Sequence, residues 1–221
     1  MKKLLYLYLI FFSFTLSQEL PNGFVYIKDI IPDIELELRY VSNDNFIGKK
    51  IDGYERPVGI LTKKAALKLK EVQDELSEFG MGLKIFDAYR PQMAVDYFVR
   101  WAKDLSDTLQ KQKYYPTVDK KDLFKDGYIA ERSSHSRGST VDLTIIFKDS
   151  KKEIDMGSGF DFFSPISWAN SSMITNQQRA NRLLLKLIME KHGFKPYSKE
   201  WWHFTLKDEP FSDKYFDFPI K

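Results

Sequence analysis

The sequence has no cysteine, and that absence excludes several kinds of structure. Disulfide bonds and thiolate metal ligands cannot form, so the fold must be held by packing and non-covalent contacts. A lipid anchor on an N-terminal cysteine is excluded for the same reason. Histidine is nearly as scarce, with three in 221 residues, so each position at which it occurs is informative.

An excess of charge of one sign is also missing. The 34 Lys and Arg residues nearly balance the 31 Asp and Glu residues, which leaves a net charge of +3. Basic residues are mixed with acidic ones along the chain, and no stretch resembles a basic stripe that could track phosphates. We therefore expect no nucleic-acid partner.

The most apolar run lies at the N-terminus and is too short for a comfortable transmembrane span. Residues 4–16 are mainly apolar, whereas a bilayer-crossing helix needs about 20 such residues. Two lysines before this run and small residues near position 17 are typical of a secretory signal peptide covering residues 1–17. A buried N-terminal helix is the alternative.

With that signal, residues 18–221 would be exported to the periplasm or beyond and would have no stable membrane association after cleavage. Without a functional signal, the chain would be cytoplasmic.

The remaining length and composition fit one domain with a substantial core. Of all residues, 43% are hydrophobic and 15% are aromatic, and about 200 residues are enough to bury such a core. Apolar spacing predicts strands at 25–27, 34–38, 83–86, 141–147 and 202–206 and helices at 62–79, 91–105 and 177–191. The last helix carries Leu183, Leu184, Leu187 and Ile188 on one side, as in an amphipathic helix. We expect an α+β fold with a small central, mainly antiparallel sheet flanked by helices.

His135 and Asp142 form the first candidate metal-binding pair. They lie seven residues apart in the run SSHSRGSTVD (133–142). A continuous strand would point them to opposite faces, because side chains alternate along a strand. A bend at Gly138 removes that restriction and lets both side chains face one ion. Alternatively, His135 is a surface loop residue and Asp142 forms a turn.

Glu200 and His203 form a second polar cluster, which encloses two tryptophans. On a helical turn they would share a face, and on a strand they would need a bulge to do so. The alternative is a tryptophan-rich core strand with a hydrogen-bonded histidine. Two histidines and a carboxylate can hold one zinc ion and leave its fourth position for water, whose proton a nearby glutamate can accept. Together, the two clusters predict a zinc hydrolase with one Zn²⁺ per chain.

Arg90 and His192 are the other residues of interest. Arg90 lies between a predicted strand and a helix that starts at Pro91, so its backbone position should be well defined. Its guanidinium could stabilise an oxyanion without losing its proton, or it could form a structural ion pair, for example with Asp87. His192 follows the predicted helix 177–191, where the helix dipole favours a cation, and we interpret it as structural.

The two motifs, S-x-H-x-x-G-x-x-x-D at 133–142 and E-x-x-H at 200–203, resemble those of the zinc D-alanyl-D-alanine dipeptidases. The likeness covers essentially everything after the predicted signal segment. It extends to Tyr40, DNFIGK (44–49), DGY (52–54), YRP (89–91), YYP (114–116), MGS (156–158), FDF (160–162) and YFDFP (215–219). The wider superfamily also contains D,D-carboxypeptidases and the hedgehog signalling domain, which share the zinc motif but not these flanking segments.

The resemblance implies a role for each residue of the predicted catalytic centre. His135, Asp142 and His203 would bind the zinc ion. Glu200 would be the catalytic base and later the proton donor, and Arg90 would stabilise the tetrahedral intermediate. The implied fold is the α+β hedgehog/D,D-peptidase type, in agreement with the pattern of predicted helices and strands.

The resemblance also implies the substrate and the residues that bind it. Ser133 and Asp161 would receive the free ammonium end of the dipeptide D-Ala-D-Ala, and Tyr40 would line the pocket. The implied reaction is hydrolysis of this dipeptide to two D-alanines. Two alternatives remain open, a zinc D,D-carboxypeptidase acting on peptidoglycan stem peptides and a non-catalytic zinc-stabilised binding domain. The sequence does not determine the oligomeric state.

Overall fold

The computed structural model describes residues 19–221, so the predicted signal peptide lies outside the described residues. The strands are β1 (Phe24–Tyr26), β2 (Glu35–Leu36), β3 (Ile60–Thr62), β4 (Met81–Asp87), β5 (Thr140–Phe147), β6 (Phe194–Tyr197) and β7 (Glu200–Leu206). The α-helices are α1 (Ile27–Ile30), α2 (Lys63–Ser77), α3 (Gln92–Lys103), α4 (Lys111–Tyr114) and α5 (Asn176–Lys191). Short 3₁₀ helices are η1 (Arg39–Val41), η2 (Lys120–Asp122), η3 (Ser134–Arg137) and η4 (Pro165–Ser167). Over residues 19–221, none of the helices has the length and apolar character needed to cross a membrane.

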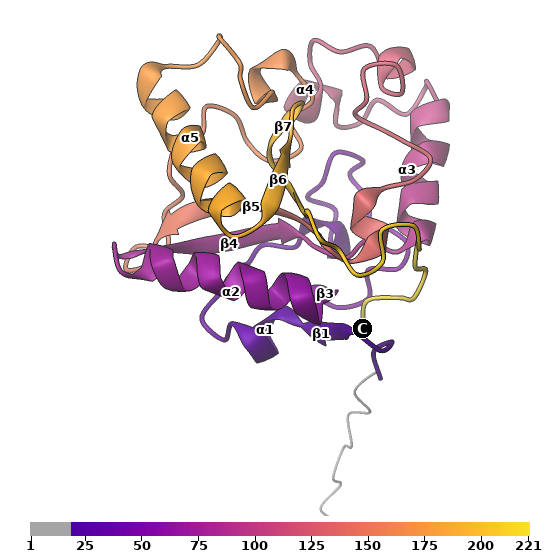
Figure 1. Cartoon of the computed structure of the whole chain (residues 1–221). Helices are drawn as coiled ribbons and strands as arrows, with labels where there is room; N and C mark the ends of the chain where they lie inside the picture. Colours follow the sequence, from indigo (N-terminus) through magenta and orange to yellow (C-terminus); the bar gives the residue numbers. More distant parts are fainter. Residues whose placement is uncertain (1–18) are drawn as a thin grey trace, which may run out of the picture.

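A five-stranded sheet organises the fold, with strand order β2-β4-β5-β7-β6. Only the β2–β4 pair is parallel; every other neighbouring pair in this sheet is antiparallel. β1 and β3 form a separate antiparallel pair. Helix α2 packs against β4 and α5 against β6, and Figure 1 shows α3 at the other end of the molecule from α5. The predicted α+β fold with a small, mainly antiparallel sheet is confirmed.

Helix α2 forms where the sequence predicts it. The Thr62 side chain caps the helix by accepting a hydrogen bond from the backbone N–H of Ala65. Of the side chains that recur at helical spacing, Ala66, Leu69, Val72 and Leu76 are buried, whereas Phe79 is 70% exposed. Each large aliphatic side chain buried in this way stabilises the fold by about 1.5–3 kcal/mol. The helix ends at Ser77, two residues before the predicted end.

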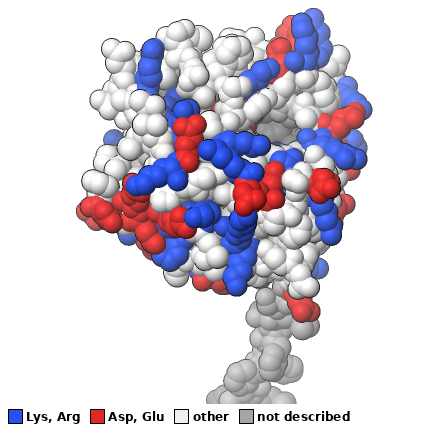
Figure 2. Space-filling view, viewed as in Figure 1, with Lys and Arg blue, Asp and Glu red and all other residues white. Residues whose placement is uncertain are grey.

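Helix α5 forms as predicted but buries a different side. Of the predicted apolar side, Leu183, Leu184 and Leu187 are 50%, 39% and 53% exposed, and only Ile188 is buried. Leu185 and Met189 are buried as well. Figure 2 shows a largely uncharged area at the upper left, where α5 lies in Figure 1. Three consecutive leucines do not define which side of a helix faces the core, because neighbouring positions are only about 100° apart. The packing of α5 against β6 determines which side of the helix is buried.

The strand predictions need several corrections. Residue 27, predicted in the first strand, begins α1, and the strand predicted at 34–38 shrinks to β2. Neither β3 nor β6 was predicted, and β6 contains Pro196 and Tyr197. Because β6 is an edge strand, a proline is tolerated there without loss of a ladder hydrogen bond. β7 starts at Glu200, two residues earlier than predicted.

The sheet register brings three polar side chains into one row. Asp87 at the end of β4 is opposite Asp142 in β5, and Asp142 is opposite His203 in β7. The β4–β5 register shifts between Ile85 and Asp87, and such an irregularity re-aims the side chain that follows it. This row is the base of the candidate site.

Candidate metal centre and active site

His135 reaches this row from η3, the single turn before β5. Gly138 ends that turn with φ +79°, a left-handed conformation that favours glycine. A Cβ atom at this position would lie 2.2 Å from a ring carbon of Phe24. The bend expected at Gly138 is therefore present, and it lets His135 and Asp142 face each other across the turn.

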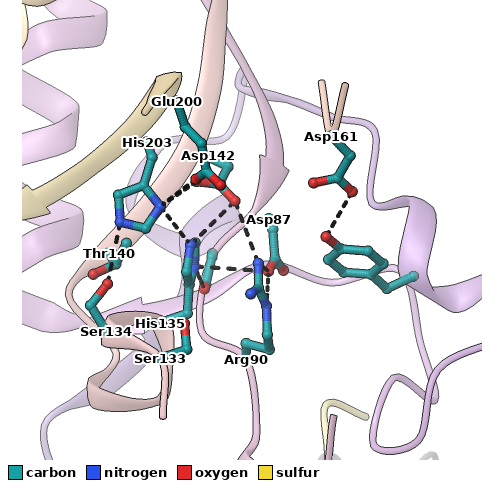
Figure 3. Close-up of polar contacts among 12 residues, drawn as sticks. Asp87, Arg90, Ser133, Ser134, His135, Thr140, Asp142, Asp161, Glu200 and His203 are labelled. Carbon is teal, nitrogen blue, oxygen red and sulfur yellow. Dashed lines mark hydrogen bonds and ion pairs between the residues drawn. The ribbon is translucent and has the colours of Figure 1, made fainter. Parts of the chain in front are cut away.

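Three ligand atoms converge at this point (Figure 3). His135 Nε2 lies 3.2 Å from Asp142 Oδ2, His203 Nδ1 lies 3.0 Å from Asp142 Oδ1, and the two imidazole nitrogens lie 3.3 Å apart. All three ligand atoms fall within 4.8 Å of one another. Burial would raise the pKa of Asp142, but the two imidazoles outweigh burial and hold that pKa well below its usual range. The carboxylate is therefore available as an anionic ligand.

The surroundings of the two histidines favour a cation between them. His135 Nδ1 lies 2.6 Å from the carbonyl oxygen of Ala88, and His203 Nε2 lies 3.3 Å from Ser134 Oγ. If each outer nitrogen donates its proton, the inner nitrogens present lone pairs to each other and to Asp142. No described residue donates a hydrogen bond to the buried Asp142 Oδ1. Lone pairs at this spacing repel unless a cation binds them, so the donor set fits a divalent metal ion with nitrogen and oxygen ligands.

Glu200 lies next to the ligand cluster without being part of it. Its Oε2 is 3.5 Å from His203 Nδ1, and its side chain is mostly buried. The β6–β7 register shifts after Pro196, so that Tyr197 is opposite Glu200, and this irregularity is the bulge that a strand would need. Burial and the nearby charge of Asp142 raise the pKa of Glu200 to about 8. A carboxylate with a raised pKa beside a metal site is suited to accept a proton from water.

Arg90 forms the structural ion pair with Asp87 that its sequence position allowed, and its guanidinium also lies beside the ligand cluster. Its Nε donates to Asp87 Oδ2 at 2.8 Å, and its Nη2 lies 3.5 Å from Asp142 Oδ2. The guanidinium also lies over the rings of Tyr40 and Phe98, with centroid distances of 5.4 and 5.2 Å. Burial would lower the pKa of Arg90, but Asp87 raises it well above its usual value. Arg90 is thus a permanently charged group held beside the ligand cluster by a structural ion pair.

Asp161 lies on the other side of Arg90 from the ligand cluster in Figure 3. Its Oδ2 accepts a 2.8 Å hydrogen bond from the hydroxyl of Tyr40. Burial raises the pKa of Asp161 well above the usual carboxyl value, and the charge of Asp142 adds to that shift. No described residue forms an ion pair with Asp161. A ligand that carries a positive charge would supply the missing partner.

One cavity of about 220 Å³ joins these groups. It is lined by all eight residues singled out from the sequence, namely Tyr40, Arg90, Ser133, His135, Asp142, Asp161, Glu200 and His203. Ser133 also caps η3, because its Oγ accepts the backbone N–H of His135 at 3.3 Å. Aromatic walls that sequence reasoning did not identify are Phe46, Phe98, Tyr128, Phe163 and Tyr197.

A family model described as D-ala-D-ala dipeptidase matches residues 21–221. The chain belongs to the D-Ala-D-Ala dipeptidase family. It is 44% identical over 199 residues to a D-alanyl-D-alanine dipeptidase of Enterococcus faecalis, covering 90% of this chain and 98% of that protein. A dipeptidase of the same name from Streptomyces coelicolor is 42% identical over 201 residues, with the same two coverages. The resemblance seen in the motifs is thereby confirmed, and the chain is a metallopeptidase.

Among solved structures, a vancomycin-resistance D,D-pentapeptidase in complex with Zn(II) matches with a TM-score of 0.41 and 13% identity. The match covers 71% of this chain and 78% of the other. A similarity at that level carries no further conclusion for this member of the dipeptidase family.

The third histidine of this dipeptidase-family chain lies elsewhere. His192 ends α5 and is held between two glutamates of α2, with Nδ1 3.1 Å from Glu71 and Nε2 2.8 Å from Glu75. It links two helices, in line with the structural interpretation. The carbonyl of Ala88, which supports His135, was not predicted from the sequence, because only the fold brings the end of β4 against η3.

Proposed function

We propose that this protein hydrolyses D-Ala-D-Ala to two D-alanines, with a single Zn²⁺ bound by His135, Asp142 and His203. The observation that carries the proposal is one cavity that combines this ligand set with Glu200 and, beyond Arg90, an anionic end at Asp161. The family membership supports the same substrate, since relatives named D-alanyl-D-alanine dipeptidase align over 98% of their length.

In this mechanism each residue acts on a defined part of the reaction. When bound, zinc supplies a Lewis acid that polarises the scissile carbonyl and brings the pKa of its water toward neutrality. Glu200 accepts the proton of the attacking water and later passes it to the leaving amine. Arg90 donates hydrogen bonds to the negative oxygen that develops, and Asp87 keeps the guanidinium in position.

The substrate's ammonium end would be received by Asp161, with Ser133 contributing to the same end. Tyr40 donates to one oxygen of Asp161 and thereby orients the carboxylate. A peptide that is capped or extended at its amino end would leave this buried carboxylate without a cation. The proposed site therefore selects free dipeptides over longer chains.

Substrate length is the direct test of this function. We expect the zinc-loaded protein to release D-alanine from D-Ala-D-Ala with a kcat/KM at least about 100-fold above that for the N-acetylated dipeptide, because the loss of one partner of a buried ion pair costs about 2–5 kcal/mol. In Asp161→Asn this ratio should shrink. Efficient cleavage of peptidoglycan stem peptides would instead support a D,D-carboxypeptidase, and zinc binding without any D-alanine release would support a non-catalytic domain.

The pH dependence of dipeptide binding should report on Asp161. Because its pKa is raised, Asp161 is protonated at pH values where ordinary carboxyls are already ionised, and the neutral acid pairs poorly with an ammonium group. Binding should therefore tighten as the pH rises above about 4, until the substrate's own α-amino group loses its proton near pH 8. We would measure the dissociation constant by calorimetry in Glu200→Ala, because this variant lacks the other carboxyl group whose pKa is raised. The tightening between about pH 4 and 8 should be much smaller in Glu200→Ala/Asp161→Asn at saturating zinc. An unchanged pH dependence in this double variant would contradict the assignment.

We further propose that the protein is exported and recycles D-alanine from cell-wall breakdown outside the inner membrane. A resistance enzyme must destroy D-Ala-D-Ala in the cytoplasm, before the dipeptide joins the cell-wall precursor, and an exported enzyme cannot do so. The basic, then apolar start of the sequence supports this proposal.

Cell fractionation tests this location. Tagged protein should be recovered from the periplasmic or extracellular fraction with an N-terminus near residue 18, and deletion of residues 2–17 should retain it in the cytosol. Intact protein found only in the cytosol would refute export and favour a role in glycopeptide resistance.

A further inference from the structure

Arg182, a buried residue of α5, has only neutral hydrogen-bond partners. Its Nε donates to Met156 O at 2.6 Å, and its Nη1 donates to Ile166 O and Trp168 O at 3.0 and 2.8 Å. No carboxylate of residues 19–221 forms an ion pair with it. Burial lowers the pKa of Arg182 to about 10, so the group still carries its charge at neutral pH. The cation is thus used to bind carbonyl groups at both ends of one segment, residues 156–168.

Asp161 lies in the middle of that segment and has an unusual backbone. Its φ is +59°, one of two positive values among the described non-glycine residues. A residue with a Cβ atom seldom adopts this conformation and keeps it only where the surrounding structure holds it in place. The orientation of the Asp161 carboxylate toward Tyr40 therefore depends on what holds the segment.

A directed chain of hydrogen bonds holds segment 156–168 in place. Ser167 Oγ donates to Phe162 O at 2.6 Å, so the 2.9 Å contact between Ser158 Oγ and Ser167 Oγ takes its proton from Ser158. Ser158 Oγ in turn accepts from Trp201 Nε1 at 3.0 Å. Phe162 is the neighbour of Asp161, and Trp201 is the neighbour of Glu200 in β7. The chain thus ties the backbone beside the proposed ammonium receptor to the strand that carries the proposed base.

We propose that Arg182, Ser158 and Ser167 form a clamp that positions Asp161 relative to Glu200 and thereby sets the length of peptide that the site accepts. This inference rests on the proposed dipeptidase function. The three residues line neither the metal cluster nor the substrate cavity, so they are positioning residues that act through Asp161. Their loss should impair substrate binding and length selection and leave the chemical step largely intact.

Ser167→Ala is the first test, with Ser171→Ala as its matched control. Both serines are buried in the same part of the chain, but Ser171 Oγ only accepts from Met173 N. We expect Ser167→Ala to raise the KM for D-Ala-D-Ala about tenfold, with a much smaller change in kcat, as for the loss of one well-placed hydrogen bond. Its preference for the free over the N-acetylated dipeptide should fall by a similar factor. Ser171→Ala should change neither quantity.

A double-mutant cycle separates positioning from general destabilisation. If Ser167 acts through Asp161, Ser167→Ala should have no further effect on KM in an Asp161→Asn background. Arg182→Lys, which keeps the charge but loses the planar fork of donors, should show the same KM effect when assayed well below its melting temperature. Additive losses in the double mutant, or a fall in kcat with an unchanged KM, would overturn the clamp. A wild-type protein that is inactive on D-Ala-D-Ala would overturn the dipeptidase function as well, so the two failures are distinguishable.

Discussion

Replacing Glu200 by alanine is expected to leave metal binding intact and to reduce kcat by a factor of about 100 to 10,000, the usual contribution of a general acid–base group. The ligand cluster consists of His135, Asp142 and His203, and it retains all its donor atoms in this variant. The loss should appear in kcat because the proposed role of Glu200 is to transfer protons and not to bind the ends of the substrate. Metal content by mass spectrometry and D-alanine release by a coupled assay would measure the two properties separately.

Glu190→Ala is a suitable control for this experiment. Glu190 is on α5, where it pairs with Lys186 at 2.9 Å, and it does not line the cavity. Its removal should affect neither the metal content nor the turnover. If Glu200→Ala kept more than about a tenth of the wild-type turnover, Glu200 would not be the base, given the size of such effects.

Replacing His203 by alanine is expected to weaken zinc binding by at least about 100-fold and to remove activity at physiological zinc. A structural zinc site contributes roughly 10–16 kcal/mol shared among four ligands, so one ligand accounts for about 3 kcal/mol. His203 is more exposed than the buried His135, so its truncation disturbs packing less. Competition with a fluorescent zinc chelator would give the affinity of the variant and of the wild type.

His192→Ala provides the matched control, because it removes the remaining histidine of the chain. Since His192 binds Glu71 and Glu75 and lies outside the ligand cluster, this variant should lose some thermal stability and keep both zinc and activity. Equal zinc affinity in His203→Ala and wild type would rule out His203 as a ligand. A loss of zinc in His192→Ala would show that the metal binds elsewhere.

Sequence reasoning succeeded where a local pattern carries the information. The helix α2 follows from its cap at Thr62 and its apolar spacing, and the turn before β5 follows from Gly138. Prediction from the sequence failed where packing against other elements determines the structure. Leu183, Leu184 and Leu187 of α5 face solvent because β6 packs against the opposite side of the helix. β6 itself contains a proline that only an edge strand tolerates.

The amino-acid sequence alone determined which groups this protein uses, because two of its three scarce histidines, the two short motifs that contain them and the flanking segments specify the chemistry of a metal-dependent dipeptidase family. Only the tertiary structure decided how these groups are supported. The carbonyl of Ala88 against His135 and the binding of segment 156–168 by Arg182 join parts of the chain that are brought together by the sheet and by α5. Such contacts depend on strand register and helix packing, and these are properties of the whole fold that no local pattern in the chain encodes.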